Sequence, residues 1–265
     1  MTGTPGRRFE DAIVLVTGGG SGIGAAAVRR FDREGCAAIY VADIDSEGAK
    51  TVAAGTRSGR AVTVDVTAAP DVDAQVDRIV AEHGRLDVVV NTAGIDDPEA
   101  KHRILAAQQS GEPVDVFRHL TDEQWRRVMS INLDGTFHVL RAAVRAMVPA
   151  GRGTIVMVGS SAAFDTLTGY PHYAASKAGV HALAQAVAKE AAAFGVRVNV
   201  VAPGPVDTPM AARTPAAVRQ SMAAAGPLGY AAPDELADNI LYLASPGASN
   251  VVGAVLLSNG GRFTV

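Results

Sequence analysis

The sequence predicts an α/β protein: a single domain built on a doubly wound parallel sheet of about seven strands with helices on both faces. Short apolar segments alternate along the chain with longer segments of helical period, which is the pattern of a parallel sheet. No linker rich in Pro, Gly or Ser divides this series, and no internal repeat stands out. A chain of 265 residues, 48% of them hydrophobic, can fill the core of one such domain. We expect residues 9–265 to form this domain, after a loose N-terminal tail over residues 1–8.

The expected strands are short and rich in apolar or β-branched residues, as in a sheet that is buried on both faces. They cover residues 13–17, 38–42, 61–65, 86–90, 154–159, 196–201 and 254–257. The expected helices cover roughly residues 22–34, 46–54, 70–83, 121–147, 173–194, 213–224 and 233–244. Two segments do not fit the alternation: a charged insertion over residues 95–120, and residues 205–231, which are rich in Ala, Pro and Met.

A glycine-rich loop follows the first expected strand. Ile13-Val-Leu-Val16 runs into Thr17-Gly-Gly-Gly-Ser-Gly-Ile-Gly24, so that Gly18, Gly22 and Gly24 have the spacing G-x-x-x-G-x-G. Glycines at such a place allow a tight turn and the close approach of a pyrophosphate, whose charge the following helix N-terminus stabilises. A plain turn is the alternative for a glycine-rich loop, but the strand before it and the helix after it favour dinucleotide binding.

An acidic residue ends the second expected strand, about twenty residues after the glycines. Asp43 is placed to accept hydrogen bonds from the hydroxyls of an adenosine ribose. It would also repel a 2′-phosphate, and neither Ser21 nor Ile44 supplies a cation to receive one. The sequence therefore predicts NAD rather than NADP as the cofactor.

Tyr173 and Lys177 are four residues apart, so they share one face of the expected helix. A free phenol has a pKa near ~10 and is a poor base at neutral pH. An ammonium about 4 Å away, at an effective dielectric near ~20, would favour the phenolate by roughly 4 kcal/mol, nearly three pKa units. Such a tyrosine would be an efficient general acid/base. The pair alone is weak support, because a Tyr and a Lys often share an exposed helix face by chance.

These motifs and several others occur in an order that resembles the short-chain dehydrogenase/reductase family, the single-domain Rossmann-fold oxidoreductases, over about residues 9–261. The ordered set is Thr17–Gly24, Asp65-Val66, Asn91-Thr-Ala-Gly94, Asn132 in Ser-Ile-Asn-Leu, Ser160, Tyr173, Lys177, and Pro203-Gly204 running to Thr208. The resemblance implies hydride transfer between NAD(H) and a secondary alcohol or ketone. A member of this fold that has lost catalysis and only senses the cofactor is the alternative, which the presence of Ser160, Tyr173 and Lys177 disfavours.

The resemblance implies four catalytic residues. Tyr173 would be the general acid/base, and Lys177 would lower its pKa and bind the nicotinamide ribose. Ser160 would hydrogen-bond the substrate oxygen; Ser161, its neighbour, is the alternative. Asn132 would hold a water of the proton relay, with an ordinary helix-surface asparagine as the alternative. Because ligands gather at the carboxyl ends of parallel strands, Ser160 after its strand and Tyr173 at the start of the next helix can face one edge.

The resemblance also implies the contacts of the cofactor, which come mostly from residues at strand ends. The predicted cofactor-binding residues are Gly18, Ser21, Gly22, Ile23, Gly24, Asp43, Ile44, Asp65, Val66, Asn91, Ala93, Gly94, Tyr173, Lys177, Pro203, Gly204, Val206 and Thr208. The pair Asn91-Thr92 departs from the Asn-Asn that the family more commonly has.

The segment 205–231 lies where the family carries its substrate-covering loop. It offers Met210, Ala211, Ala212, Met222 and Leu228, with few fixed charges. This composition indicates a mainly apolar alcohol or ketone. The chain also resembles the NAD-dependent hydroxyacyl and hydroxysteroid dehydrogenases of the family, which implies a substrate similar to a hydroxyacyl compound or a hydroxysteroid.

A reductase of 3-oxoacyl groups carried on an acyl carrier or coenzyme A is the alternative. Such reductases resemble this chain, but they typically use NADPH and dock an acidic carrier on basic residues. Arg145 matches one such position, whereas Phe194 stands where a second arginine would be expected. Together with Asp43, this disfavours the carrier-protein alternative.

The composition excludes several other classes. A net charge of −3 without blocks of like charge gives nucleic-acid binding no electrostatic support. Cys36, the single cysteine, excludes an intramolecular disulfide and is expected to be a packing residue. No signal-peptide core and no apolar run of transmembrane length occur, so we expect a cytoplasmic protein.

The histidines and serines show no pattern of a metal site or a hydrolase. No G-x-S-x-G elbow surrounds Ser160 or Ser161, which sets a serine hydrolase aside. His172 is expected either to line the substrate pocket or to lie in a solvated turn. The remaining histidines lack metal-ligand spacing and are expected at surface or ordinary helix positions: His83, His102, His119, His138 and His181.

The two long expected helices, 121–147 and 173–194, are the elements through which members of the family commonly form dimers or tetramers. Each carries an apolar stripe at helical spacing, and each needs one such face for its own sheet. The second helix is also rich in small residues on its other faces: Ala178, Gly179, Ala182, Ala184, Ala186 and Ala188. Small side chains permit a close helix approach, so we expect a homotetramer, a dimer of dimers.

Overall fold

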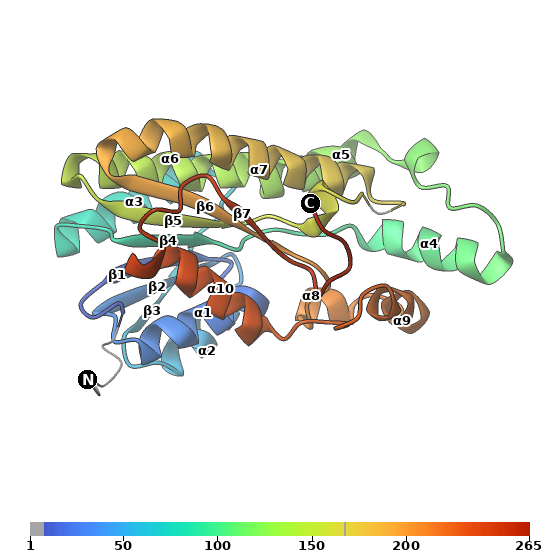
Figure 1. Ribbon diagram of the computed structural model, residues 1–265, viewed down its shortest axis with the longest axis horizontal. Coiled ribbons are helices and arrows are strands. Elements are labelled where there is room, and N and C mark those ends of the chain that lie inside the picture. Colours follow the sequence, from blue (N-terminus) through green and yellow to red (C-terminus); the bar gives the residue numbers. More distant parts are fainter. Residues whose placement is uncertain (1–7, 167) are drawn as a thin grey trace.

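The computed structural model describes residues 8–166 and 168–265, which form a parallel sheet covered by helices on both faces (Figure 1). The order of the strands in the sheet is β3-β2-β1-β4-β5-β6-β7, and every pair of neighbours is parallel. The strands are β1 Ile13–Thr17, β2 Ala38–Asp43, β3 Gly59–Thr63, β4 Val88–Asn91, β5 Gly153–Val158, β6 Val196–Pro203 and β7 Val255–Ser258. The predicted fold class is therefore confirmed.

The helices form a layer on each side of the sheet and a group beyond the carboxyl ends of its strands (Figure 1). The α-helices are α1 Gly22–Arg33, α2 Ser46–Ala54, α3 Ala69–His83, α4 Pro98–Ser110, α5 Asp122–Met129, α6 Gly135–Met147, α7 Pro171–Ala191, α8 Pro209–Ala212, α9 Ala216–Ala224 and α10 Pro233–Ala244. Short 3₁₀ turns cover Phe117–His119, Val148–Ala150, Ser161–Ala163, Ala192–Phe194 and Pro246–Ala248.

Both faces of the sheet are buried. Successive side chains of a strand point to opposite faces. Ile13 and Leu15 of β1 belong to the core under α3, α6 and α7, whereas Val14 and Val16 belong to the core under α1, α2 and α10. This explains why the strands are continuous apolar runs in the sequence rather than alternating ones.

The expected helix 121–147 is in fact two helices, α5 and α6, joined by a π-helical turn over Ser130–Asp134. The α5 helix begins at a capping box, in which the Gln124 N–H donates to the Thr121 hydroxyl at 3.2 Å and the Thr121 N–H donates to Gln124 at 2.9 Å. The π turn places Asn132 in the interior, where it is fully buried. Turns of this kind are common at functional sites.

The charged insertion contains a helix, α4, that is not among the expected ones. Asp97 caps the N-terminus of α4 by accepting the Glu99 N–H at 3.0 Å, and the helix ends before Gly111, whose φ is +73°. Ile104 on its buried face packs in one cluster with Val218 of α9. The two segments that break the strand–helix alternation thus pack against each other, beyond the carboxyl ends of the strands (Figure 1).

Smaller differences lie at the ends of elements. The third strand covers Gly59–Thr63 instead of 61–65, so Asp65 lies in the loop after it. The expected helix 213–224 is divided into α8 and α9, because Pro215 disfavours a helical Thr214 before it.

Of the expected N-terminal tail, residues 1–7 lie outside the described part of the chain. Arg8 does not belong to a loose tail: its backbone N–H and its Nε donate to Glu34 at 3.1 and 3.0 Å. Within the described ranges, no helix combines the length and the apolar character needed to cross a membrane.

Candidate active site

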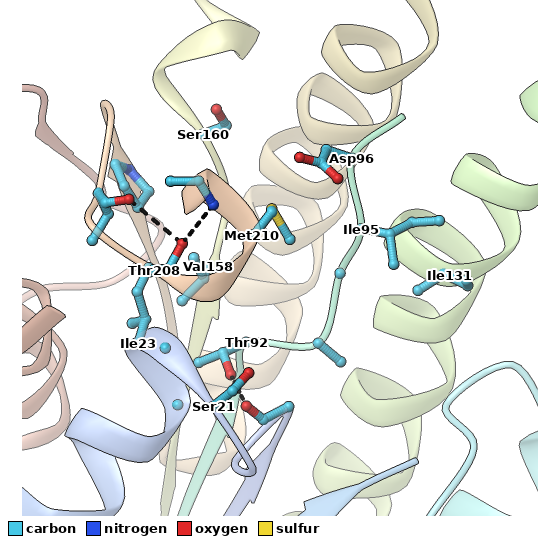
Figure 2. Close-up of a pocket in the computed structure, with 18 of the residues that line it drawn as sticks. Ser21, Ile23, Thr92, Ile95, Asp96, Ile131, Val158, Ser160, Thr208 and Met210 are labelled. Atoms are coloured by element: carbon cyan, nitrogen blue, oxygen red, sulfur yellow. Dashed lines mark hydrogen bonds between the residues drawn. The ribbon is translucent and has the colours of Figure 1, made fainter. Parts of the chain in front are cut away.

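A cavity of about 670 Å³ lies at the carboxyl ends of the strands, where ligands gather in open α/β sheets (Figure 2). Most of the predicted site residues line it: Gly18, Ser21, Gly22, Ile23, Gly24, Asp43, Ile44, Asp65, Val66, Ala93, Gly94, Ser160, Tyr173, Lys177, Pro203, Gly204, Val206 and Thr208. Asn91 and Asn132 are predicted site residues that do not line it.

The glycine loop between β1 and α1 is too close to its neighbours for larger side chains. Gly18 has a φ of +68°, and a Cβ there would lie 2.6 Å from the Ala93 nitrogen. A Cβ on Gly24 would lie 2.2 Å from the Gly18 oxygen. Ser21, the N-cap of α1, makes no side-chain hydrogen bond to the helix N–H groups. The loop therefore offers the cavity backbone donors and a positive helix end, which fit a diphosphate.

Asp43 is held in place at the end of β2. Its Oδ2 accepts the Gly20 N–H at 2.9 Å and its Oδ1 accepts the Asp45 N–H at 3.0 Å. Next to it, Ile44 is 69% exposed at the mouth of the cavity. A fixed carboxylate beside the glycine loop fits the hydroxyls of an adenosine ribose.

The loop after β6 lies next to the glycine loop and lines the same cavity. Thr208 caps α8: its Oγ1 accepts the Ala211 N–H at 3.2 Å and donates to the Val206 oxygen at 3.5 Å (Figure 2). A Cβ on Gly22 would lie 3.2 Å from Thr208 Cγ2, so the two loops are in near contact.

Ser160, Tyr173 and Lys177 meet in the cavity from the end of β5 and the first turns of α7. The Ser160 Oγ accepts the Ala162 N–H at 3.1 Å, which fixes the hydroxyl at the start of a 3₁₀ turn. Ser161, the alternative serine, begins that turn and is not among the residues that line the cavity. Lys177 Nζ donates to the Val158 oxygen at 3.0 Å and lies 5.9 Å from the centre of the Tyr173 ring.

Burial is the largest cause of the pKa shifts of both Tyr173 and Lys177. It lowers the pKa of Lys177 to about 8. It also raises the pKa of Tyr173, while the Ser160 hydroxyl lowers that pKa and the Asp96 carboxylate raises it further. In this structure the pKa of Tyr173 is therefore raised above its ordinary value, and the expected lowering by Lys177 stays a prediction. The ammonium is directed to the Val158 carbonyl rather than to the phenol, and burial disfavours its own charge.

Asn132 lies behind the cavity rather than on a helix surface. Its Oδ1 accepts the Ile95 N–H at 2.8 Å, and its Nδ2 donates to the Ile95 oxygen at 3.0 Å and to Ser176 Oγ at 3.1 Å. A Cβ on Gly94 would lie 3.2 Å from Asn132 Oδ1 and 3.4 Å from Lys177 Nζ, so both side chains reach the same glycine. The interpretation as an ordinary surface asparagine is wrong.

Asn91 is also buried, and its side chain does not line the cavity, so its contact with a cofactor stays a prediction. Its Oδ1 accepts a hydrogen bond from the Thr17 hydroxyl, and its Nδ2 donates to Thr136 Oγ1 at 2.9 Å. Both ends of the amide are thus used to join β1, β4 and α6, and the side chain does not reach the cavity.

Two histidines of α7 are buried, contrary to expectation. His181 Nε2 accepts the Ser160 N–H at 3.3 Å, and burial together with Lys177 lowers its pKa to about 4. The ring is therefore neutral and holds the backbone of Ser160. Its position eight residues after Tyr173 and four after Lys177 is the sequence signal that could have identified it, because all three share one helix face.

His172 neither lines the cavity nor lies in a solvated turn. It is fully buried, and its Nε2 is 3.1 Å from Asp97 Oδ2. Burial lowers its pKa although the neighbouring carboxylate acts in the opposite direction. The contact fastens the start of α4 to the start of α7.

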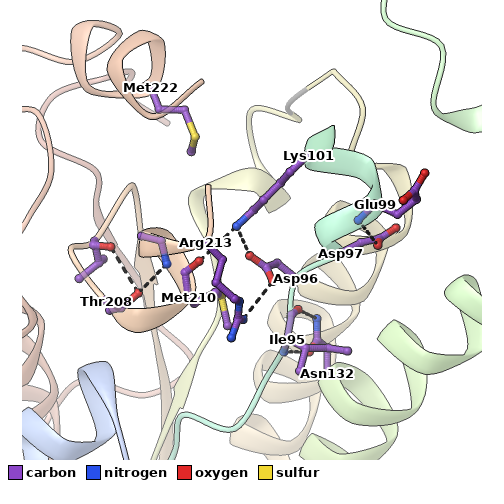
Figure 3. Close-up of polar contacts among 12 residues, drawn as sticks. Ile95, Asp96, Asp97, Glu99, Lys101, Asn132, Thr208, Met210, Arg213 and Met222 are labelled. Carbon is purple, nitrogen blue, oxygen red and sulfur yellow. Dashed lines mark hydrogen bonds and ion pairs between the residues drawn. The ribbon is translucent and has the colours of Figure 1, made fainter. Parts of the chain in front are cut away.

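Charged side chains line the cavity beyond the Ser160–Tyr173 pair (Figure 3). Lys101 of α4 forms a buried ion pair with Asp96, and Arg213 after α8 approaches the same carboxylate at 3.4 Å. The expectation of a lining with few fixed charges is therefore wrong. Of the apolar residues expected there, Met210, Ala211 and Met222 line the cavity, whereas Ala212 does not and Leu228 is 79% exposed.

Neither a metal site nor a reactive thiol is found in the part of the chain that the structure describes. Within residues 8–166 and 168–265, no group of three or more His, Cys, Asp or Glu side chains is arranged to hold a metal ion. Cys36 is buried, and burial raises the pKa of its thiol to about 12.

Comparison with known proteins agrees with this geometry. The short chain dehydrogenase family model matches residues 12–219. Cis-4-hydroxycyclohexanecarboxylate dehydrogenase of Sinomonas cyclohexanicum is 42% identical over 98% of this chain and 100% of its own. The 3-oxoacyl-acyl-carrier-protein reductase FabG of Thermotoga maritima is 34% identical over 96% of this chain and 98% of its own.

A solved structure is also similar to this chain in fold. The crystal structure of gox2181 has a TM-score of 0.83 and 28% sequence identity, with 97% of each chain covered. The family matched acts on hydroxyl or keto groups and uses nicotinamide cofactors, and the protein is an oxidoreductase of this kind. With the family model matched over most of its length, this chain belongs to the short-chain dehydrogenase family.

Proposed function

We propose that the protein is an NAD-dependent dehydrogenase that interconverts a secondary alcohol and its ketone, with Tyr173 as the general acid/base. The observation that carries the proposal is the position of Ser160, Tyr173 and Lys177 in the same cavity as the glycine loop and Asp43. A dinucleotide on the glycine loop and a small molecule beside Tyr173 would then share one site. The nicotinamide group supplies a hydride acceptor for oxidation and a hydride donor for reduction.

The residues around the substrate oxygen have different roles in proton transfer. Tyr173 Oη takes the hydroxyl proton during oxidation and returns it during reduction. Ser160 Oγ, fixed by the Ala162 N–H and by the support of His181, hydrogen-bonds the same oxygen and holds it in line. Lys177 would bind the nicotinamide ribose and exchange protons with the phenol. Asn132, which reaches Gly94 beside Lys177, would position a water of the proton relay.

The preference for NAD rests on Asp43. Among the described residues that line the cavity, the cations are Lys101, Lys177 and Arg213, and none of them follows β2. We expect NAD to bind at least about tenfold more tightly than NADP, because Asp43 repels a 2′-phosphate. Asp43→Ser combined with Ile44→Arg should narrow or reverse this ratio by adding a phosphate partner. Dissociation constants of both cofactors, measured by calorimetry, check the prediction.

A matched control for cofactor choice is Glu47→Gln, which removes an exposed carboxylate of α2 that does not line the cavity. It should leave the ratio of the two dissociation constants unchanged. Tighter binding of NADP than of NAD by the wild type would overturn the assignment.

Substrate class can be tested with NAD reduction over secondary alcohols of graded size, hydroxyacyl thioesters, hydroxysteroids and cis-4-hydroxycyclohexanecarboxylate, the compound in the name of the 42% identical relative. Turnover of at least one of these alcohols, lost in Tyr173→Phe, supports the proposal. Binding of NAD without turnover of any of them would favour a cofactor-sensing protein instead.

A 3-oxoacyl reductase is the second candidate, supported by the 34% identical FabG. Two features disfavour a carrier-protein partner. Arg145 is already paired with Asp73 at 3.3 Å, and Phe194 is 51% exposed where a second cation is expected. A substrate that is not bound to a carrier protein is therefore the better fit. We also expect the protein to be cytoplasmic.

We also propose that the protein is a homotetramer. Ala178, Ala182 and Ala186 are exposed on the outer face of α7, while Ala184 and Ala188 are buried in the core beneath it. Trp125 of α5 and Phe137 of α6 are 40% and 43% exposed. Small residues on one exposed helix and aromatic residues on neighbouring ones suit a close contact between helices.

Ala182→Glu is expected to dissociate the assembly, because a charged side chain would be buried between two helices. Sedimentation velocity over a range of concentrations measures the change, and Lys50→Glu on the exposed surface of α2 is the control. A wild-type protein that stays monomeric at all concentrations would refute the tetramer.

A further inference from the structure

We infer that the substrate carries a carboxylate group and that Arg213 binds it, while Lys101 cancels the charge of Asp96 next to it. The three side chains come from two distant parts of the chain and converge on the cavity (Figure 3). Asp96 follows β4, Lys101 lies in the first turns of α4, and Arg213 follows α8. The inference deepens the proposed function, on which it rests for the position of the reacting alcohol beside Ser160 and Tyr173.

The Asp96–Lys101 pair is complete without a ligand. The two side chains are 8% and 7% exposed and form an ion pair, and Lys101 Nζ also donates to the Met210 oxygen at 3.2 Å. A buried carboxylate near the reacting centre would repel an anionic substrate if it stood alone. Paired with Lys101, it contributes little net charge to the cavity.

Because the charges of Asp96 and Lys101 balance each other, Arg213 adds a net positive charge to this part of the cavity. Its one described ion pair is with Asp96 Oδ1, through Nη2 alone at 3.4 Å, which is long for a charge-assisted hydrogen bond. A guanidinium has five N–H donors and binds a carboxylate best through two parallel hydrogen bonds. The Arg213 side chain is 56% exposed, so donors remain that can turn toward a ligand in the cavity.

The anionic subsite lies close to the proposed chemistry. The charged cluster lines the same cavity as Ser160 and Tyr173, and the Asp96 charge raises the pKa of the Tyr173 phenol. Met210, Met222 and Tyr230 line the same cavity as Arg213. The geometry fits a compact molecule with an apolar body, a secondary hydroxyl at one position and a carboxylate at another. A neutral alcohol or a neutral ester would bring no anion to this guanidinium.

The test compares one anionic alcohol, cis-4-hydroxycyclohexanecarboxylate, with two neutral ones, its methyl ester and cyclohexanol. With saturating NAD, we expect wild-type kcat/KM to be at least about tenfold higher for the acid than for the ester. Arg213→Gln should raise KM for the acid by about 10–100-fold and leave the ester and the affinity for NAD unchanged. Arg213→Lys should restore part of the preference, since it keeps the charge but not the paired donors.

Two further variants separate charge recognition from stability. Arg118→Gln is the matched control, because Arg118 is an exposed arginine that pairs with Asp115 at 2.6 Å and does not line the cavity. It should behave as the wild type. Asp96→Asn combined with Lys101→Met removes both partners of the buried pair, so no lone buried charge remains. This double variant should keep its preference for the acid, because Arg213 is still present.

A binding experiment distinguishes failure of this inference from failure of the proposed function. Cyclohexanecarboxylate has no hydroxyl, and calorimetry should detect its binding to the wild type with NAD and a loss of affinity in Arg213→Gln. Equal use of acid and ester by the wild type, or equal losses for both in Arg213→Gln, would overturn the inference while the dehydrogenase remained active. Arginine-dependent binding of the carboxylate without turnover of any alcohol would support the subsite and refute the proposed function.

Discussion

Tyr173→Phe is expected to lower kcat for alcohol oxidation by about 10²–10⁴-fold, the range that a positioned general acid/base contributes. The substitution removes only the phenolic oxygen. The ring packs against an apolar cluster that includes Ile104 and Tyr170, so the fold and the affinity for NAD should be preserved. Steady-state kinetics with saturating NAD, together with calorimetry for the cofactor, measure both effects.

Tyr170→Phe is the matched control for this prediction. Tyr170 is a second phenol of the same cavity, next to the start of α7, and burial raises its pKa far above the working range. We expect it to keep most of the wild-type activity. Retention of more than a few per cent of activity by Tyr173→Phe, or an equal loss in Tyr170→Phe, would show that another group transfers the proton.

The parts of the fold that the sequence predicts are those determined by local patterns. Runs such as Ile13-Val-Leu-Val16 identify buried parallel strands because both faces of the sheet are covered. The glycine loop is predictable because Gly18 and Gly24 have no room for a side chain. Helix α4 could have been predicted as well. Asp97 as N-cap, a proline at the first helical position and Gly111 after the last turn are its start and stop signals.

The charged part of the site depends on tertiary contacts, which sequence patterns do not contain. Arg213 meets Asp96 across 117 residues of sequence, so the composition of one loop alone suggested an apolar cavity. The pKa of Tyr173 was not predictable for a related reason. Four-residue spacing brings Lys177 near the ring, but the direction of the ammonium depends on the Val158 carbonyl, and the degree of burial depends on the whole fold.

The titration of Tyr173 and Lys177 gives the second large expected effect. Burial lowers the pKa of Lys177 to about 8 and raises that of Tyr173, so the pair carries both of its protons below about pH 8. Loss of one proton leaves either a neutral Lys177 amine beside a Tyr173 phenol or a Lys177 ammonium beside a Tyr173 phenolate. The two forms share one apparent pKa, which belongs to the pair. The form with the Tyr173 phenolate accepts the proton of the substrate hydroxyl. Oxidation should therefore rise with pH through an apparent pKa near 8, and reduction should fall over the same range.

The nearby histidines do not explain such a profile. His181 has its pKa lowered to about 4, and burial also lowers the pKa of His172 below its ordinary value. Both rings are neutral throughout the range in which the rate is expected to change. The pH dependence of kcat/KM at saturating NAD is thus a direct measurement of the Tyr173–Lys177 pair.

Lys177→Met is expected to move the rise in oxidation to beyond about pH 10, because the only remaining group is a phenol whose ordinary pKa is already near ~10 and which burial raises. At pH 8 the rate should fall by about 10²-fold or more, and raising the pH should recover part of it. Saturating NAD separates this effect from weaker cofactor binding. A profile that still rises near pH 8 in Lys177→Met would assign that proton to another group and contradict a shared proton on the pair.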